Sequence, residues 1–133
     1  MPLHTLVVTR YRVPDASATA FRDRIRDALD AFAGTAGFLG GRVGRSTDEP
    51  DLWVLQMSFR DLGSYRRALS SYDVKLRAVP VMYDALDEPS AFEVLEQSGA
   101  GAEESRATSD LAADADAVNV GEASAPEVGS DLD

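Results

Sequence analysis

The order of apolar and polar residues along the chain predicts a small domain of strands and helices. Residues 3–13 alternate, as a strand with two different faces does. One face of this strand carries Thr5, Val7, Thr9 and Tyr11. Residues 17–33 instead repeat their apolar positions every three to four residues, which predicts an amphipathic helix. The apolar stripe of this helix consists of Phe21, Ile25, Ala28, Leu29 and Phe32.

A pair of strands follows the helix. The two strands are residues 38–45 and 53–59, and the polar stretch 46–51 is the turn between them. Gly40 and Gly41 stand together inside the first of these strands. Glycine weakens a strand, so this pair predicts a bulge or a close approach of another segment to the backbone.

Helical segments and a last strand complete the pattern. Asp61 stands where a helix N-cap is expected, because its carboxylate can accept a hydrogen bond from the first turn. The candidate inner face of that helix carries Leu62, Tyr65, Ala68 and Leu69. Another helical piece spans residues 72–79, and Pro80 should kink or end it. Residues 91–95 are predicted to form the final strand.

This order of elements predicts an α+β fold of the ferredoxin-like, split β-α-β type over residues 1–96. Such a fold has a four-stranded antiparallel sheet with helices on one face only. Val8 and Val54 would then lie on the uncovered face. An exposed apolar sheet face favours association, so we expect a second copy of the chain to cover it as a homodimer.

Charge separates the end of the chain from this domain. The net charge is −10, and residues 97–133 contribute most of it, with nine acidic residues, one arginine and no aromatic residue. This composition predicts a disordered acidic tail; a short helix near residues 110–118 and a tail that binds a partner are the alternatives. The domain itself is close to neutral, which argues against nucleic acid as a partner.

Several classes of site and location are disfavoured by composition. The chain has no cysteine and one histidine, His4, so disulfides, thiol catalysis and an ordinary metal site are not expected. No apolar run is long enough to cross a membrane, and the N-terminal residues lack the basic region of a signal peptide. We therefore expect a cytoplasmic protein without membrane contact.

Two segments give the chain a resemblance to a known family. They read VTRYRV, in the first strand, and GFLGGRVGRSTDEPDLWVLQMSFRDLGSYRRAL, from the strand pair into the second helix. Over residues 3–95 the chain resembles the antibiotic biosynthesis monooxygenase family of dimeric α/β barrels. The resemblance implies the ferredoxin-like fold, a dimer, and a ligand held between the sheet and the helices.

The resemblance implies two kinds of chemistry, of which one is disfavoured by the residues present. Haem-degrading members use an Asn, a Trp and a His, at positions that correspond here to Thr9, Phe59 and about Ala78. His4 is too near the start of the first strand to replace the missing ligand. No haem or other cofactor is therefore expected.

The second chemistry is the oxidation of a phenolic polyketide to a quinone without a cofactor. It needs hydrogen-bond donors that stabilise a phenolate or carbanion while oxygen reacts. The candidate catalytic residues are Thr9, Tyr65, Tyr72 and Arg77. The candidate substrate-binding residues are Tyr11, Trp53, Met57 and Phe59. The family's Asn and Trp are again absent from their expected places.

Each candidate also has an ordinary structural interpretation. Thr9 fits a strand by propensity alone, and tyrosines on helices often pack with the hydroxyl at the rim. Trp53 and Phe59 could be core residues between sheet and helices. The sequence therefore leaves two functions open: a cofactor-independent monooxygenase-like enzyme for a small aromatic molecule, and a dimeric ligand-binding or accessory protein without turnover.

Overall fold

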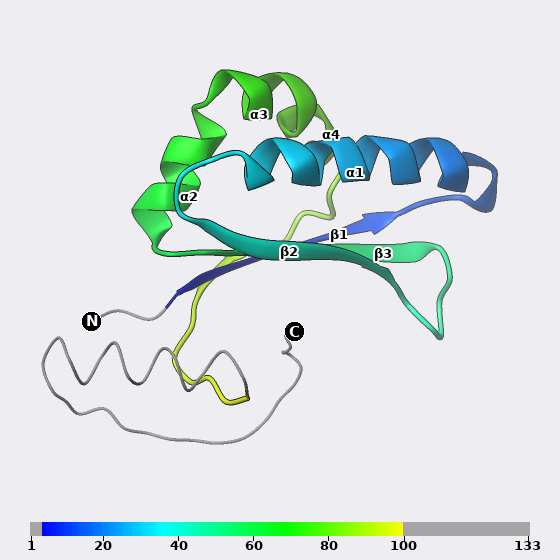
Figure 1. The fold of residues 1–133 in the computed structure, drawn as a ribbon. Helices are drawn as coiled ribbons and strands as arrows, with labels where there is room; N and C mark the ends of the chain where they lie inside the picture. Colours follow the sequence, from blue (N-terminus) through cyan, green and yellow to red (C-terminus); the bar gives the residue numbers. More distant parts are fainter. Residues whose placement is uncertain (1–3, 100–133) are drawn as a thin grey trace, which may run out of the picture. The chain divides into compact units, whose positions relative to one another are not determined.

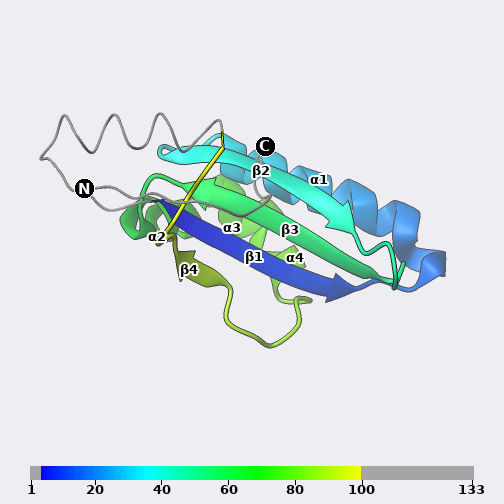
Figure 2. The same ribbon diagram turned by 90° about the horizontal axis from the view of Figure 1, so that it is seen from below.

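In the computed structural model, helices lie over one face of a sheet (Figure 1), and four antiparallel strands form this sheet in the order β2-β3-β1-β4 (Figure 2). The strands are β1 (Thr5–Arg12), β2 (Phe38–Arg45), β3 (Leu52–Phe59) and β4 (Ala91–Glu93). The helices are α1 (Ala18–Ala33), α2 (Leu62–Leu69), α3 (Tyr72–Arg77) and α4 (Val79–Met82), with a 3₁₀ turn η1 (Asp15–Ser17) before α1. The predicted ferredoxin-like α+β fold is confirmed.

The structure describes residues 4–99, and its helices and strands lie in the compact unit His4–Glu93. Residues 94–99 have no regular secondary structure. The predicted acidic tail lies outside the described residues from residue 100 on. Within the described part, no helix has both the length and the apolar character to cross a membrane.

The sheet has one covered and one open face. In β1 the odd-numbered residues from Thr5 to Tyr11 are buried, and β3 alternates in the same way. The helices lie on this inner face, whereas the view from the other side meets the strands first (Figure 2). The open face carries partly exposed apolar residues, among them Leu6, Val8, Val54 and Phe92. Strand alternation therefore assigns both faces correctly.

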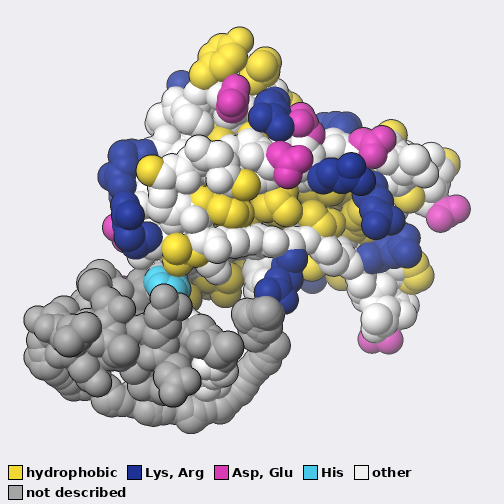
Figure 3. Space-filling view, viewed as in Figure 1, with side chains coloured by type: hydrophobic (Ala, Val, Ile, Leu, Met, Phe, Trp, Pro, Cys, Tyr) yellow, Lys and Arg dark blue, Asp and Glu magenta, His cyan; other side chains and the backbone are white. Residues whose placement is uncertain are grey.

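Aromatic rings fill the space between the sheet and α1. At one end Phe21 packs between Tyr11 and Trp53, with ring centroids 5.2 and 5.5 Å away. At the other end Phe59 contacts Phe32 at 5.9 Å and Phe38 at 5.5 Å, both edge-to-face. These contacts make the inner face a packed core with favourable ring geometry, and hydrophobic side chains are visible between α1 and β2 in Figure 3.

Glycines near β2 accompany one bulge and two close approaches. The strand register shifts between Phe38 and Gly40, so the predicted bulge is confirmed. A Cβ atom on Gly41 would lie 2.6 Å from Leu29 Cδ1, so the predicted close approach is confirmed as well. Gly37 has φ +89° and abuts Ser64 of α2, which leaves no room for a side chain.

The predicted break at Pro80 is confirmed, and one inner-face position differs from the expectation. α3 ends at Arg77, and Pro80 lies in the first turn of a separate helix, α4, where its missing N–H would have no helical acceptor anyway. Leu62 is 39% exposed, and Ser64 takes the inner position because its small side chain fits against Gly37.

The last strand is also shorter than expected. β4 ends at Glu93 because its partner there, Thr5, is the first residue of β1.

The predicted N-cap of α2 is confirmed. The backbone N–H of Ser64 donates to Asp61 Oδ1 at 2.7 Å. This hydrogen bond and the Ser64 hydroxyl lower the pKa of Asp61. A lowered pKa in the folded state means that the cap stabilises the fold above the unfolded-state pKa, and that this contribution is lost as pH falls through the folded pKa.

We expect Asp61→Ala to lower the melting temperature at pH 7, because the first turn of α2 loses its cap. Asp61→Asn keeps an acceptor oxygen and should stay close to the parent protein at pH 7. The asparagine cannot titrate, so the variant should lose less stability than the parent between pH 7 and pH 3. Thermal unfolding at both pH values measures this. If the parent and Asp61→Asn lose the same stability between pH 7 and pH 3, the protonation of Asp61 does not weaken the cap.

Candidate active site

Two tyrosines and two smaller hydroxyl residues lie along the inner face of β1 and the segment that leads to β4. On β1 the Thr9 hydroxyl and the Tyr11 phenol are 2.8 Å apart, and either can donate. From α2, the Tyr65 phenol lies beside Ser90, whose side chain acts to lower the pKa of that phenol. Burial raises the pKa of Tyr11 and of Tyr65, so both phenols keep their protons at neutral pH.

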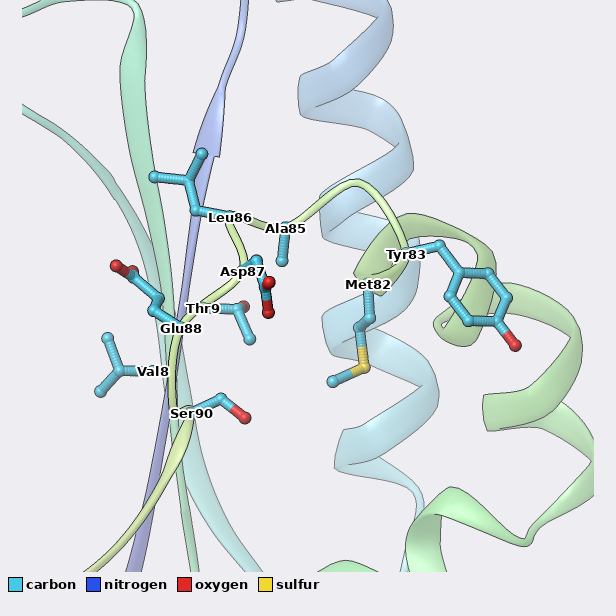
Figure 4. Close-up of a pocket in the computed structure, with 9 residues that line it drawn as sticks. All are labelled: Val8, Thr9, Met82, Tyr83, Ala85, Leu86, Asp87, Glu88 and Ser90. Atoms are coloured by element: carbon cyan, nitrogen blue, oxygen red, sulfur yellow. The ribbon is translucent and has the colours of Figure 1, made fainter.

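A cavity of about 400 Å³ opens beside these residues. It is lined by Val8, Thr9, Met82, Tyr83, Ala85, Leu86, Asp87, Glu88 and Ser90. Thr9 and Ser90 contribute hydroxyl groups to the lining, and the phenol of Tyr11, which is outside the lining, is 2.8 Å from the Thr9 hydroxyl. Figure 4 shows Thr9, Asp87 and Ser90 extending to the same side of β1, toward Met82, while the Tyr83 ring points away. The cavity thus combines an apolar wall with a few polar groups, as ligand sites commonly do.

The segment between α4 and β4 forms the outer wall of this cavity and is attached to β1 at three points. The Leu86 N–H donates to the Arg10 carbonyl at 2.8 Å, and the Val8 N–H donates to the Ser90 carbonyl at 2.7 Å. The Arg10 guanidinium donates to both carboxylate oxygens of Glu88, at 2.7 and 3.0 Å. Between these attachments the segment leaves the strand, which creates the cavity.

The lining of the cavity contains acidic side chains but no basic ones. Two carboxylates, Asp87 and Glu88, line it, and no arginine or lysine does. The Arg10 guanidinium neutralises Glu88 and lowers the pKa of its carboxyl group. Asp84, next to the lining, lies 3.5 Å from the Arg24 guanidinium. Asp87 is the lining carboxylate that is not paired with an arginine in these contacts.

The structure brings together three of the residues selected from the sequence: Thr9, Tyr11 and Tyr65. It does not bring the other two candidate catalytic residues to them. Tyr72 is 77% exposed on α3. Arg77 donates to Asp27 Oδ1 of α1 at 2.7 and 3.0 Å, and this pair lowers the pKa of Asp27. Neither residue lines the cavity.

The aromatic wall expected from the sequence lies elsewhere. Trp53, Met57 and Phe59 are at most 5% exposed and belong to the core between sheet and helices. None of them lines the cavity, whose apolar side is formed by residues such as Met82 and Leu86. Their predicted contact with substrate stays a prediction.

Sequence reasoning did not select Met82, Asp87 or Ser90. These residues lie in a stretch without clear periodicity, and their importance depends on how that stretch folds back along β1. Pro89, just before β4, was the one local signal of a break there. No group of three or more His, Cys, Asp or Glu side chains in residues 4–99 is arranged to hold a metal ion.

The fold and the cavity define a class of protein: a ferredoxin-like domain with a cavity of about 400 Å³ formed by β1 and the segment between α4 and β4. The family model of antibiotic biosynthesis monooxygenase matches residues 5–76. The chain belongs to this family, as the resemblance of its strand pair and second helix implied.

Solved structures share the fold at low sequence identity. SnoaB, a cofactor-independent oxygenase from Streptomyces nogalater, is 22% identical, with a TM-score of 0.61 over 71% of this chain and 95% of that chain. A conserved protein from Methanosarcina mazei is 17% identical, with a TM-score of 0.58 over 68% and 92% of the two chains. A proposed antibiotic biosynthesis monooxygenase from Nitrosomonas europaea is 15% identical, with a TM-score of 0.59 over 74% and 97%. No curated protein matches the sequence.

Proposed function

We propose that the protein is a monooxygenase-like enzyme that oxidises a small aromatic molecule in this cavity without a metal or organic cofactor. The family supports the reaction class, and SnoaB supports the idea that this fold can work on oxygen without a cofactor. The observation that carries the proposal is the Thr9 hydroxyl, which lines the cavity and is held at 2.8 Å by the phenol of Tyr11.

The two lining hydroxyls have a defined chemical task in this proposal. Hydrogen bonds in a chain polarise one another, so a hydroxyl backed by a protonated phenol is a stronger donor to a ligand. Thr9 and Ser90 would hold the oxygen of a phenol or ketone as its negative charge develops. Met82 and Leu86 would contact the apolar part of the ring system.

Molecular oxygen is the only other reactant. For an anthrone, the ring CH₂ group loses two hydrogens and becomes a carbonyl. One oxygen atom of O₂ enters that carbonyl, and the other leaves as water with the two hydrogens. The four electrons that reduce O₂ all come from the substrate, so no external reductant is needed.

Oxygen uptake with anthrone and with simple hydroquinones tests this proposal. We expect one O₂ consumed for each anthraquinone formed, at a rate above that of the buffer. The fixed stoichiometry separates oxygenation from slow autoxidation to peroxide. Absence of uptake above buffer with all of these compounds would contradict the enzymatic proposal.

A second function is favoured by the position of Tyr72 and Arg77. Because one is exposed and the other is paired with Asp27, half of the expected catalytic set does not face the cavity. A ligand-binding or accessory protein would need the cavity but not these groups. Binding of anthrone without oxygen uptake would favour this function.

We also propose that the chain acts as a homodimer through the open sheet face. This face carries Leu6, Val8, Val54 and Phe92, and Phe92 is 45% exposed. Packing two such faces removes this apolar surface from water.

Val54→Glu should convert the dimer to a folded monomer, because a carboxylate in the centre of a packed apolar interface would lose its hydration. Leu76→Glu is the matched control, since Leu76 is 59% exposed on α3, on the helix side of the sheet. Sedimentation velocity gives the mass of each protein, and circular dichroism checks the fold. A monomeric parent protein, or a dimer that survives Val54→Glu, would contradict the interface.

A further inference from the structure

The charge at the cavity points to a property of its ligand. We propose that the cavity takes an aromatic ligand that carries both a phenolic hydroxyl and a positively charged amine, with Asp87 pairing with the amine. This inference rests on the proposed binding role of the cavity and names its ligand class.

The first step of the argument is the pairing of each acidic group. Glu88 is held by two hydrogen bonds from Arg10, at 2.7 and 3.0 Å, so its charge is already satisfied. Asp84 is 3.5 Å from Arg24. Within residues 4–99, Asp87 forms no ion pair with an arginine or lysine, although it lies between Asp84 and Glu88 in the sequence. One negative charge therefore remains at the cavity.

The second step is the position of Asp87 relative to the hydroxyls. Asp87, Thr9 and Ser90 extend to the same side of β1 in Figure 4. A ligand whose phenolic oxygen contacts Thr9 or Ser90 thus lies beside a carboxylate. The basic residues do not offset this carboxylate, because no arginine or lysine lines the cavity and Arg77 is paired with Asp27.

The third step is the comparison with an anionic ligand. A carboxylate on the ligand would meet Asp87 without a lining cation to offset the repulsion, and like charges in contact disfavour binding. A neutral ligand would leave Asp87 solvated as before. A ligand ammonium group adds an attraction that the other two lack, and the preference should weaken as salt is added.

Three ligands of nearly equal size isolate this effect: tyramine, tyrosol and 4-hydroxyphenylacetate, which are positive, neutral and negative at pH 7. Calorimetric titration of the full chain measures each affinity under nitrogen, so that no turnover occurs. We expect tyramine to bind about fivefold more tightly than tyrosol, in the range of a partly exposed ion pair, and 4-hydroxyphenylacetate to bind more weakly than both.

Asp87→Asn should remove the preference for tyramine and leave the affinity for tyrosol unchanged. Asp84→Asn is the matched control: it removes a carboxylate three residues away that is engaged by Arg24 and does not line the cavity, and the preference should remain. Equal affinities of the parent protein for tyramine and tyrosol would overturn the inference. A preference that survives Asp87→Asn, or no binding of any of the three, would also overturn it.

The binding experiment is independent of the oxygenase proposal. A tyramine preference that depends on Asp87, together with no oxygen uptake, would leave the ligand class standing and remove the enzymatic function. Oxygen uptake with anthrone, together with equal binding of the three phenols, would support the enzymatic function and remove the proposed ligand class.

Discussion

Gly37→Ala should unfold at a much lower temperature than the parent protein. The backbone of Gly37 has φ +89°, a conformation that residues with a Cβ rarely adopt, and a Cβ there would lie 2.5 Å from Ser64 Cβ. Ser64 is fully buried, so α2 cannot yield without leaving the sheet. Strain and overpacking together should cost about 3 kcal/mol, which corresponds to roughly 15 °C for a domain of this size. Thermal unfolding measures this.

Gly40→Ala is the matched control for this variant. Gly40 lies in β2, three residues after Gly37, and a Cβ there would meet nothing within 4 Å. Its melting temperature should therefore stay close to that of the parent. Equal and small losses in both variants would show that the contact between Gly37 and Ser64 is looser than described.

Thr9→Val should lower kcat for anthrone oxidation about 100-fold, the usual cost of removing one donor to a developing negative charge. The substitution preserves shape and removes only the hydroxyl that lines the cavity. It also leaves the Tyr11 phenol without the Thr9 hydroxyl as a hydrogen-bond partner, which should lower the free energy of unfolding by about 1–2 kcal/mol. Quinone absorbance gives kcat and KM, and a melting curve gives the stability change.

Thr5→Val separates the catalytic effect from a change in the sheet. Thr5 lies on the same face of β1, is 6% exposed and does not line the cavity. Its substitution should leave kcat unchanged. If the two variants lose activity equally, the Thr9 hydroxyl does not act on the substrate, and the site proposed here is wrong.

The fold was largely predictable because its signals are local. The alternation of β1 between Thr5 and Tyr11, the stripe of α1 and the cap at Asp61 each depend on neighbours in sequence. The errors fall where long-range packing decides, as at Leu62, which gives up the inner position to Ser64. The break at Pro80 is again a local signal, because α3 ends just before this proline and α4 carries it in its first turn.

The candidate site was only half predictable, for a related reason. Thr9 and Tyr11 share a strand face by alternation, so their proximity could be expected. Tyr72 could not be placed, because α3 has six residues and a single buried one, Val74. Tyr72 lies about 200° around the helix from Val74 and therefore faces away from the core. Ser90 and Asp87 gain their roles from tertiary contacts that no local pattern contains.

The alternation of β1 has a consequence for how its gene can change. Thr9 faces the cavity and the helices, whereas Arg10, its neighbour, holds Glu88 on the other side of the strand. Inserting or deleting one codon before Thr9 would exchange these faces, placing arginines in the core and breaking the attachment of the cavity wall. The turn at residues 46–51 has mostly exposed residues and no such constraint. Length variation among descendants of this gene should therefore collect in that turn, while β1 changes by substitution alone.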